Sequence, residues 1–201
     1  EDPATVAELG RALSEGLMAE GVLPVIKHIP GHGRAKSDSH KELPVVSAPL
    51  KELEVTDFLP FEYLNEMPWA MTAHVVYKAI DPKKAATISP VIIKEIIRNK
   101  IKFKGLLLSD DIGMEALSGT KGERALMILD AGCDLTLECS GKIEDMTEVA
   151  SIIPVMTEEA IGRAIKAEEL RQNKRTEDGL AYEELLEELK NILWEHQIEG
   201  A

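Results

Sequence analysis

Residues 27–40, KHIPGHGRAKSDSH, place three histidines, an aspartate and two glycines within fourteen positions. Asp38 and His40 are two residues apart, a spacing that allows a carboxylate to hold an imidazole in one tautomer and to keep it basic. Because an imidazole titrates near neutral pH, it can donate a proton and later remove one. Gly31 and Gly33 allow the loop to move or to adopt positive φ angles. The segment therefore contains the groups that acid–base catalysis requires.

A second acidic group, Asp110 and Asp111, follows a run of leucines at residues 106–108. Asp110 is expected near the low-dielectric end of a buried strand. A carboxylate there can act as a nucleophile, a metal ligand or a helix cap. Asp111 is interpreted as a cap or as a residue that supports its neighbour.

Apolar segments with two different periodicities predict the elements that position these residues. The expected strands cover residues 22–26, 69–77, 105–108 and 133–137. The expected helices lie between Asp2 and Gly21, from Ser89 onward, at 122–130 and, with a break at 178–179, over 157–198. Helices between apolar strands indicate an α/β fold whose parallel sheet is covered on both faces.

Each predicted strand ends in polar residues, namely Lys27 and His28, His74, Asp110 and Asp111, and Glu138. The carboxyl ends of parallel strands share one edge of a sheet, and the active sites of α/β proteins collect there. We therefore expect these side chains to converge on one site.

Composition excludes several classes of partner. The 201 residues are 44% hydrophobic, which supports a core, and the net charge of −13 argues against nucleic acids and anionic membrane surfaces. No apolar run reaches the ~18 residues of a membrane span, and no signal peptide opens the sequence. Cys133 and Cys139 give no disulfide framework, so we expect reduced thiols and a cytoplasmic location.

Four motifs together resemble glycoside hydrolase family 3, and most closely the bacterial β-N-acetylglucosaminidases of peptidoglycan recycling. They are KHIPGHG at 27–33, DSH at 38–40, MTAH at 71–74 and SDDIGM at 109–114. The likeness runs through residue 141 and weakens in the helical tail.

The resemblance implies a (β/α)8 TIM barrel that hydrolyses a glycosidic bond with retention of configuration. It identifies Asp110 as the nucleophile that forms a glycosyl-enzyme intermediate. His40, paired with Asp38, would be the acid/base, and Lys27 and His28 would bind sugar hydroxyls. We add three residues of the same motifs to the substrate-binding set: His32, Met71 and His74.

The expected function is therefore hydrolysis of terminal N-acetylglucosamine from muropeptides, with no cofactor and no metal ion. Retention needs an ionised nucleophile and a group that first gives and then removes a proton. The cationic form of His40 is favoured by nearby Asp110 and Asp38. An imidazole repels phosphate less than a carboxylate does, so a phosphorylase of the same family stays an alternative.

Only four strands are predicted, whereas TIM barrels have eight strands in ~250 residues. By resemblance, the first motif corresponds to the fifth strand of the family's barrel. We therefore interpret residues 1–156 as the C-terminal half of the barrel and residues 157–201 as a helical tail that packs on it. The missing half is expected in the full-length chain, and the isolated piece is expected to be inactive.

Two further alternatives remain at this stage. A non-catalytic, sugar-binding fragment would bind ligand without a covalent intermediate. A metal-dependent hydrolase would use His28, His32, His40 and Asp110 as ligands. Pro30 and the adjacent glycines, however, exclude the helix that a pair of histidines four residues apart would need to share one metal ion.

Overall fold

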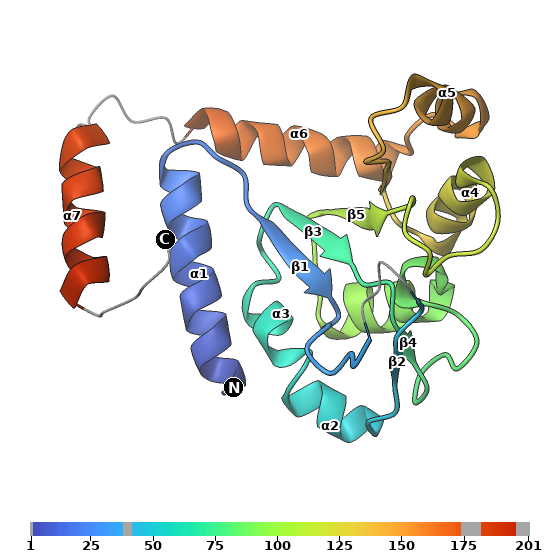
Figure 1. The fold of residues 1–201 in the computed structure, drawn as a ribbon, viewed down its shortest axis with the longest axis horizontal. Coiled ribbons are helices and arrows are strands. Elements are labelled where there is room, and N and C mark those ends of the chain that lie inside the picture. The colour runs from blue at the N-terminus through green and yellow to red at the C-terminus, as the bar shows by residue number, and fades with distance from the viewer. Residues whose placement is uncertain (1, 38–41, 174–181, 196–201) are drawn as a thin grey trace.

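The computed structural model describes residues 2–37, 42–173 and 182–195, and its centre is a four-stranded parallel sheet (Figure 1). The strands lie in the order β1 (Val25–Ile29), β3 (Trp69–Thr72), β5 (Leu106–Asp111) and β6 (Leu135–Leu137). A second parallel sheet pairs β2 (Val45–Val46) with β4 (Val76–Tyr77). The register places Lys27 beside Met71 and Met71 beside Leu108, so the carboxyl ends of three neighbouring strands reach the same edge.

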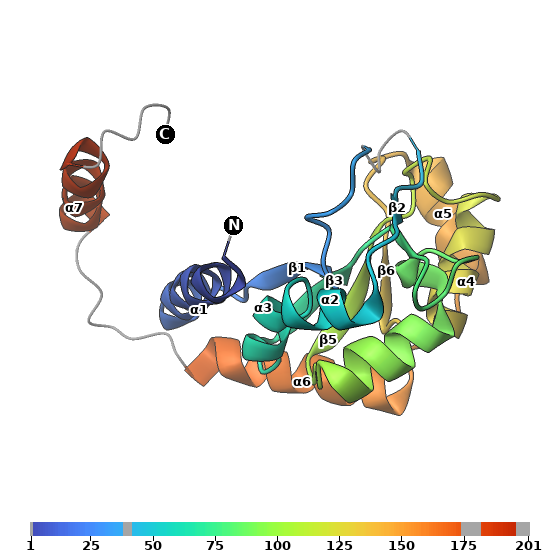
Figure 2. The same ribbon diagram turned by 90° about the horizontal axis from the view of Figure 1, so that it is seen from below.

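Helices connect and cover these strands. In chain order they are α1 (Pro3–Ala19), α2 (Leu50–Val55), α3 (Leu59–Tyr63), the 3-10 turn η1 (Ala86–Ile88), the π-helix η2 (Ile92–Lys100), α4 (Lys121–Ala131), α5 (Ile143–Ile152), α6 (Glu158–Asn173) and α7 (Tyr182–Glu195). Figure 2 shows α6 and the green helix η2 along the same side of the sheet. None of the helices described has the length and apolar composition of a membrane span.

Local sequence signals explain where the well-predicted helices begin and end. The Asp2 carboxylate accepts a hydrogen bond from the Thr5 amide at 2.9 Å, and Pro3 occupies the first helical position of α1. At α4, Thr120 and Glu123 form a reciprocal capping box, and Gly132 ends the helix with a φ of 108°. These starts and stops agree with the sequence-based expectations.

The predicted strand over residues 69–77 is wrong in one respect, because it contains two strands in different sheets. β3 ends at Thr72, after which the Ala73 amide donates to the Ile29 carbonyl and the chain turns away. Pairing resumes at Val76, now against Val45 of β2. The elements β2, α2, α3 and α5 were not predicted, and a break near residue 178 lies outside the described residues.

The core lies between the sheet and the helices that cover it. Four isoleucines of η2 are buried against it, namely Ile92, Ile93, Ile96 and Ile97. In β5, Leu106 and Leu107 are almost completely buried. Burying one such side chain contributes about 1.5–3 kcal/mol relative to exposure, so this stripe is a main source of stability.

A buried aspartate at the amino end of β6 ties two helices to the sheet. Asp134 accepts hydrogen bonds from Arg98 of η2 at 2.8 Å and from Arg163 of α6 at 2.5 Å. The same carboxylate accepts from the Leu107 amide at 2.8 Å. Ala160 and Ala167 of α6 are also buried, so α6 packs on the sheet, whereas Leu185, Leu189 and Ile192 of α7 are 42–51% exposed.

Replacement of Asp134 should therefore destabilise the fold. Asp134→Ala leaves Arg98 and Arg163 without their carboxylate partner, and we expect the free energy of unfolding to fall by about 3–5 kcal/mol in urea denaturation. Glu66→Ala is the matched control, because the Glu66–Lys104 pair is exposed on both sides and its loss should cost under about 1 kcal/mol. Equal losses in the two variants would contradict the role given to Asp134.

Candidate active site

The carboxyl edge of the sheet brings a histidine and a carboxylate from two strands together. His28 of β1 places Nε2 3.5 Å from Oδ2 of Asp110 in β5, and the two side chains are 28% and 16% exposed. The other oxygen of this carboxylate, Oδ1, accepts a hydrogen bond from the Asp111 amide at 2.9 Å. Asp110 is thus held on one oxygen by the backbone while the other faces an imidazole.

His28 faces this carboxylate as a largely neutral group. Burial lowers its pKa from 6.5, and Asp110 acts in the opposite direction. The positive charges that His32 and Lys27 can carry lower the pKa further, and the His32 ring centroid lies 5.4 Å from that of His28. A neutral imidazole can donate one hydrogen bond and accept another, which suits it to binding hydroxyl groups.

Lys27, His28 and His32 also line one cavity of about 730 Å³ beside β1. Its wall continues onto α1 and α3 with apolar residues such as Leu13 and Phe61. Asp110 is not among the residues that line it. Three of the predicted substrate-binding residues therefore share one concave surface, with the Asp110 carboxylate next to His28.

Asp111 organises the loop that follows β5, in agreement with its interpretation as a cap or a supporting residue. Its Oδ1 accepts hydrogen bonds from the amides of Gly113 at 2.9 Å and of Cys139 at 3.2 Å. Cys139 belongs to the loop after β6, so one carboxylate joins the two loops. This leaves Asp110 as the carboxylate of the pair that faces His28.

His74 is fully buried, and both of its ring nitrogens have partners. Nδ1 lies 2.8 Å from the Thr87 hydroxyl, and Nε2 lies 3.0 Å from the main-chain carbonyl oxygen of Asp111. Burial lowers its pKa, although the Asp111 carbonyl and the carboxylates of Asp110 and Asp111 act in the opposite direction. Met71, in contrast, lies on β3 between Lys27 and Leu108 and is partly exposed.

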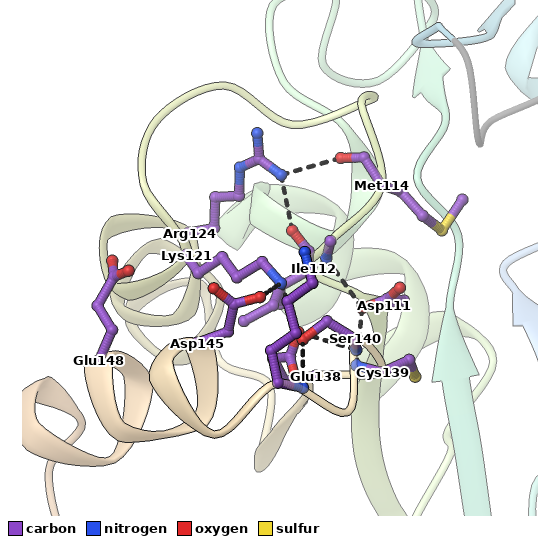
Figure 3. A network of polar contacts seen from close by, with 12 residues as sticks. Asp111, Ile112, Met114, Lys121, Arg124, Glu138, Cys139, Ser140, Asp145 and Glu148 are labelled. Atoms are coloured by element: carbon purple, nitrogen blue, oxygen red, sulfur yellow. Dashed lines mark hydrogen bonds and ion pairs between the residues drawn. The ribbon is translucent and has the colours of Figure 1, made fainter.

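A polar network that the sequence did not predict supports the loops after β5 and β6 (Figure 3). Lys121 contacts Glu138 at 2.5 Å and Asp145 at 2.6 Å, and these contacts lower the pKa of both carboxylates. Arg124 donates to the carbonyl oxygens of Ile112 and Met114. Glu138 is therefore engaged in holding the loop beyond its strand.

The predicted acid/base pair, Asp38 and His40, lies outside the described residues. The segment that leads to it is anchored by Arg34, which contacts Asp57 at 2.6 Å and Glu52 at 2.7 Å. The Tyr77 hydroxyl donates to the Gly31 carbonyl. Among the residues described, no cluster of three or more histidine, cysteine, aspartate or glutamate side chains is placed to hold a metal ion.

The parallel α/β sheet, with a histidine and an aspartate at its carboxyl edge, is typical of α/β enzymes, whose active sites lie at this edge. The sequence model of the glycosyl hydrolase family 3 N-terminal domain matches residues 1–167. The chain belongs to this family, and its sheet is part of the family's TIM barrel.

Similar proteins carry related names. A beta-hexosaminidase of Neisseria meningitidis serogroup C is 43% identical over 143 residues, which cover 69% of this chain and 39% of that protein. The beta-hexosaminidase of Nitrosospira multiformis is 38% identical over 143 residues, 69% of this chain and 41% of its own. The chain thus spans about two fifths of the curated relatives it matches.

Solved structures show the same likeness. NagZ from Neisseria gonorrhoeae in complex with N-trifluoroacetyl-D-glucosamine matches with a TM-score of 0.73 and 35% identity, over 86% of this chain and 52% of that one. CbsA from Thermotoga neapolitana matches with a TM-score of 0.73 and 34% identity, over 88% of this chain and 43% of its own.

The lowered pKa values of His28 and His74 make stability depend on pH with a definite sign. As the pH falls through 6.5, histidines of the unfolded chain bind protons before these two do in the folded protein, so acidification should favour unfolding. Thermal unfolding followed from about pH 8 to 5.5 should show a steeper fall in the wild type than in His74→Gln, whose side chain does not titrate. Parallel curves would contradict the neutral state assigned to His74.

Proposed function

We propose that the full-length protein containing this chain is a retaining β-N-acetylglucosaminidase that removes terminal N-acetylglucosamine from peptidoglycan fragments. The observation that carries the proposal is the arrangement of Asp110, with one carboxylate oxygen held by the Asp111 amide and the other facing His28. An anchored carboxylate at the carboxyl edge of a barrel sheet is placed to attack an anomeric carbon.

Asp110 is proposed as the nucleophile and His40, paired with Asp38, as the acid/base. Departure of the leaving group requires that it receive a proton, and attack of water on the glycosyl-enzyme requires that the water lose one. An imidazole can carry out both steps near neutral pH without deep burial. The assignment of His40 and Asp38 rests on the DSH motif, and the anchoring of Arg34 shows where the segment leading to them is fixed.

Lys27, His28 and His32 are proposed to bind sugar hydroxyls, and Met71 to contact the sugar from β3. The first three line the cavity beside β1, and His28 lies next to the Asp110 carboxylate, so their polar groups surround one place at which a sugar can bind. The relative crystallised with N-trifluoroacetyl-D-glucosamine supports an N-acylated glucosamine as the sugar. We further propose a cytoplasmic location, in keeping with the free thiols of Cys133 and Cys139.

The remaining half of the barrel is proposed to lie against β1 and α1. Val25 of β1 and Leu9 and Leu13 of α1 are exposed, the two leucines by 66% and 68%. Large apolar side chains gathered on one side of a protein mark a surface that another element covers. The coverage of only 39% of a curated relative agrees with a missing part of this size.

Trapping of the intermediate tests the nucleophile. We expect the full-length protein, incubated with a 5-fluoro N-acetylglucosaminyl substrate, to carry the sugar on Asp110 when its peptides are mapped by mass spectrometry. Asp110→Asn should lose the label and at least about 10³-fold of the turnover of a chromogenic N-acetylglucosaminide, since removal of a nucleophile leaves only binding and charge effects. Asp111→Asn is the matched control and should still be labelled; a label on Asp111 or Glu138 would refute the assignment.

The isolated chain tests the half-barrel interpretation. We expect residues 1–201 alone to show no turnover of the chromogenic substrate above the Asp110→Asn background. The exposed edge of β1 and the missing strands deprive the site of one side. The full-length protein assayed in parallel serves as the positive control. Turnover by the isolated chain at the full-length rate would show that the described half is sufficient.

A further inference from the structure

The peptide group that follows Asp111 is held at both ends, and one end depends on a buried histidine. Pairing between β3 and β5 ends with Met71 beside Leu108, so no residue of β3 pairs with Asp111. Nε2 of His74 lies 3.0 Å from the Asp111 carbonyl oxygen instead. The next amide, that of Ile112, donates to the Leu137 carbonyl at 2.9 Å. The peptide plane therefore cannot rotate without breaking a contact.

The contacts that hold this peptide group also affect the orientation of Asp110, the proposed nucleophile. The Asp111 amide donates to Oδ1 of Asp110, and its direction follows from the placement of Asp111. The Asp111 side chain adds two contacts, from the amides of Gly113 and Cys139. Asp111 is thus held by contacts with His74, Gly113 and Cys139, and its amide in turn holds the Asp110 carboxylate.

Hydrogen-bond directions fix the tautomer of His74. A carbonyl oxygen can only accept, so Nε2 must carry the proton. Burial lowers the pKa of the ring and so disfavours a second proton on Nδ1, which lies 2.8 Å from the Thr87 hydroxyl. That hydroxyl has one proton, which Nδ1 or the Ala73 carbonyl 2.9 Å away can accept, and its oxygen lies 2.9 Å from the Thr72 hydroxyl. These buried contacts form a chain from β3 to the carboxyl end of β5, in which the Asp111 contact alone fixes the proton on Nε2.

We propose that His74 is a positioning residue for the Asp110 nucleophile and does not contact the sugar. This inference rests on the proposed function and replaces the substrate contact that the MTAH motif led us to expect. The neutral ring acts as a strut: its Nε2–H holds the Asp111 carbonyl, and the Asp111 amide holds Asp110 in the orientation for attack. A misplacement of about 1 Å at a reacting group can cost about 10²-fold in rate.

Kinetics of the full-length protein with a chromogenic N-acetylglucosaminide test this role. His74→Phe keeps a planar aromatic ring, somewhat larger than imidazole, and loses both hydrogen bonds, and we expect kcat to fall about 10²-fold with KM within about twofold of wild type. His74→Gln can still donate to the Asp111 carbonyl and should recover at least about 10-fold of that loss. A raised KM with an unchanged kcat would instead indicate a sugar contact.

Two controls separate positioning from packing and from proton transfer. Thr72→Val removes the far end of the hydrogen-bond chain at an equally buried site and should keep kcat within about threefold of wild type. Equal losses in His74→Phe and His74→Gln would reduce His74 to a packing residue and overturn the proposal. The pH dependence of kcat should keep both of its limbs in His74→Gln, because His74 itself does not transfer a proton.

An NMR measurement decides the structural claim without any substrate. Long-range ¹⁵N–¹H spectra of the full-length protein labelled at histidine should show one ring that stays neutral with its proton on Nε2 between about pH 6 and 8, and this signal should be missing in His74→Phe. A proton on Nδ1 alone would overturn the proposal. Failure of the wild type to cleave the substrate would refute the glycosidase function, and the tautomer would then still decide whether His74 holds Asp111.

Discussion

The shared carboxyl edge of the parallel sheet is the constraint on which the site depends. The register aligns Lys27, Met71 and Leu108 across three strands, so the last residues of these strands lie at the same edge of the sheet. His28 and Asp110 meet at 3.5 Å because β1 and β5 flank β3 in that register. A slip of one residue in either pairing would turn its side chains to the opposite face.

The acidic residues at this edge, Asp110 and Glu138, have partners that differ in charge. Burial lowers the pKa values of His28 and His74, so these two rings bring little positive charge to Asp110. A carboxylate that is not neutralised by a permanent ion pair stays available for bond formation, whereas Glu138, bound to Lys121, is committed to the loop. The two acidic residues thus have separate roles because their partners differ in charge.

The sequence predicts those parts of the fold and site that depend on short-range signals. The caps at Asp2 and Gly132 and the presence of four apolar strands follow from local patterns, although the first strand lies at Val25–Ile29 and not at 22–26. The predicted meeting of polar strand ends is observed for His28 and Asp110, whereas Glu138 pairs with Lys121. Asp110 and Asp111 have different roles because their carboxylates point to different sides of the strand. The alternation of side chains along a strand suggests this difference but does not decide which carboxylate faces His28.

Longer-range features escaped prediction for a physical reason. The MTAH motif shows that a histidine follows a strand, but whether His74 meets sugar or backbone depends on the distant residues Thr87 and Asp111. The contacts of Lys121 with Glu138 and Asp145 join segments that no periodicity connects. Similarly, the sequence does not distinguish Arg34 from the other basic residues of its loop, because its partner Asp57 lies in the distant segment between α2 and α3.

Local contacts also explain why half of a barrel can keep its site residues in place. Asp110, Asp111, His74 and His28 are held by contacts among β1, β3, β5 and the loops beyond them, and none of these contacts needs a strand on the far side of β1. Without the other half of the barrel, the cavity at Lys27 and His32 lacks one wall, but the position of the Asp110 carboxylate does not change. Placement of the nucleophile is therefore local to this chain, whereas enclosure of the sugar requires the whole barrel.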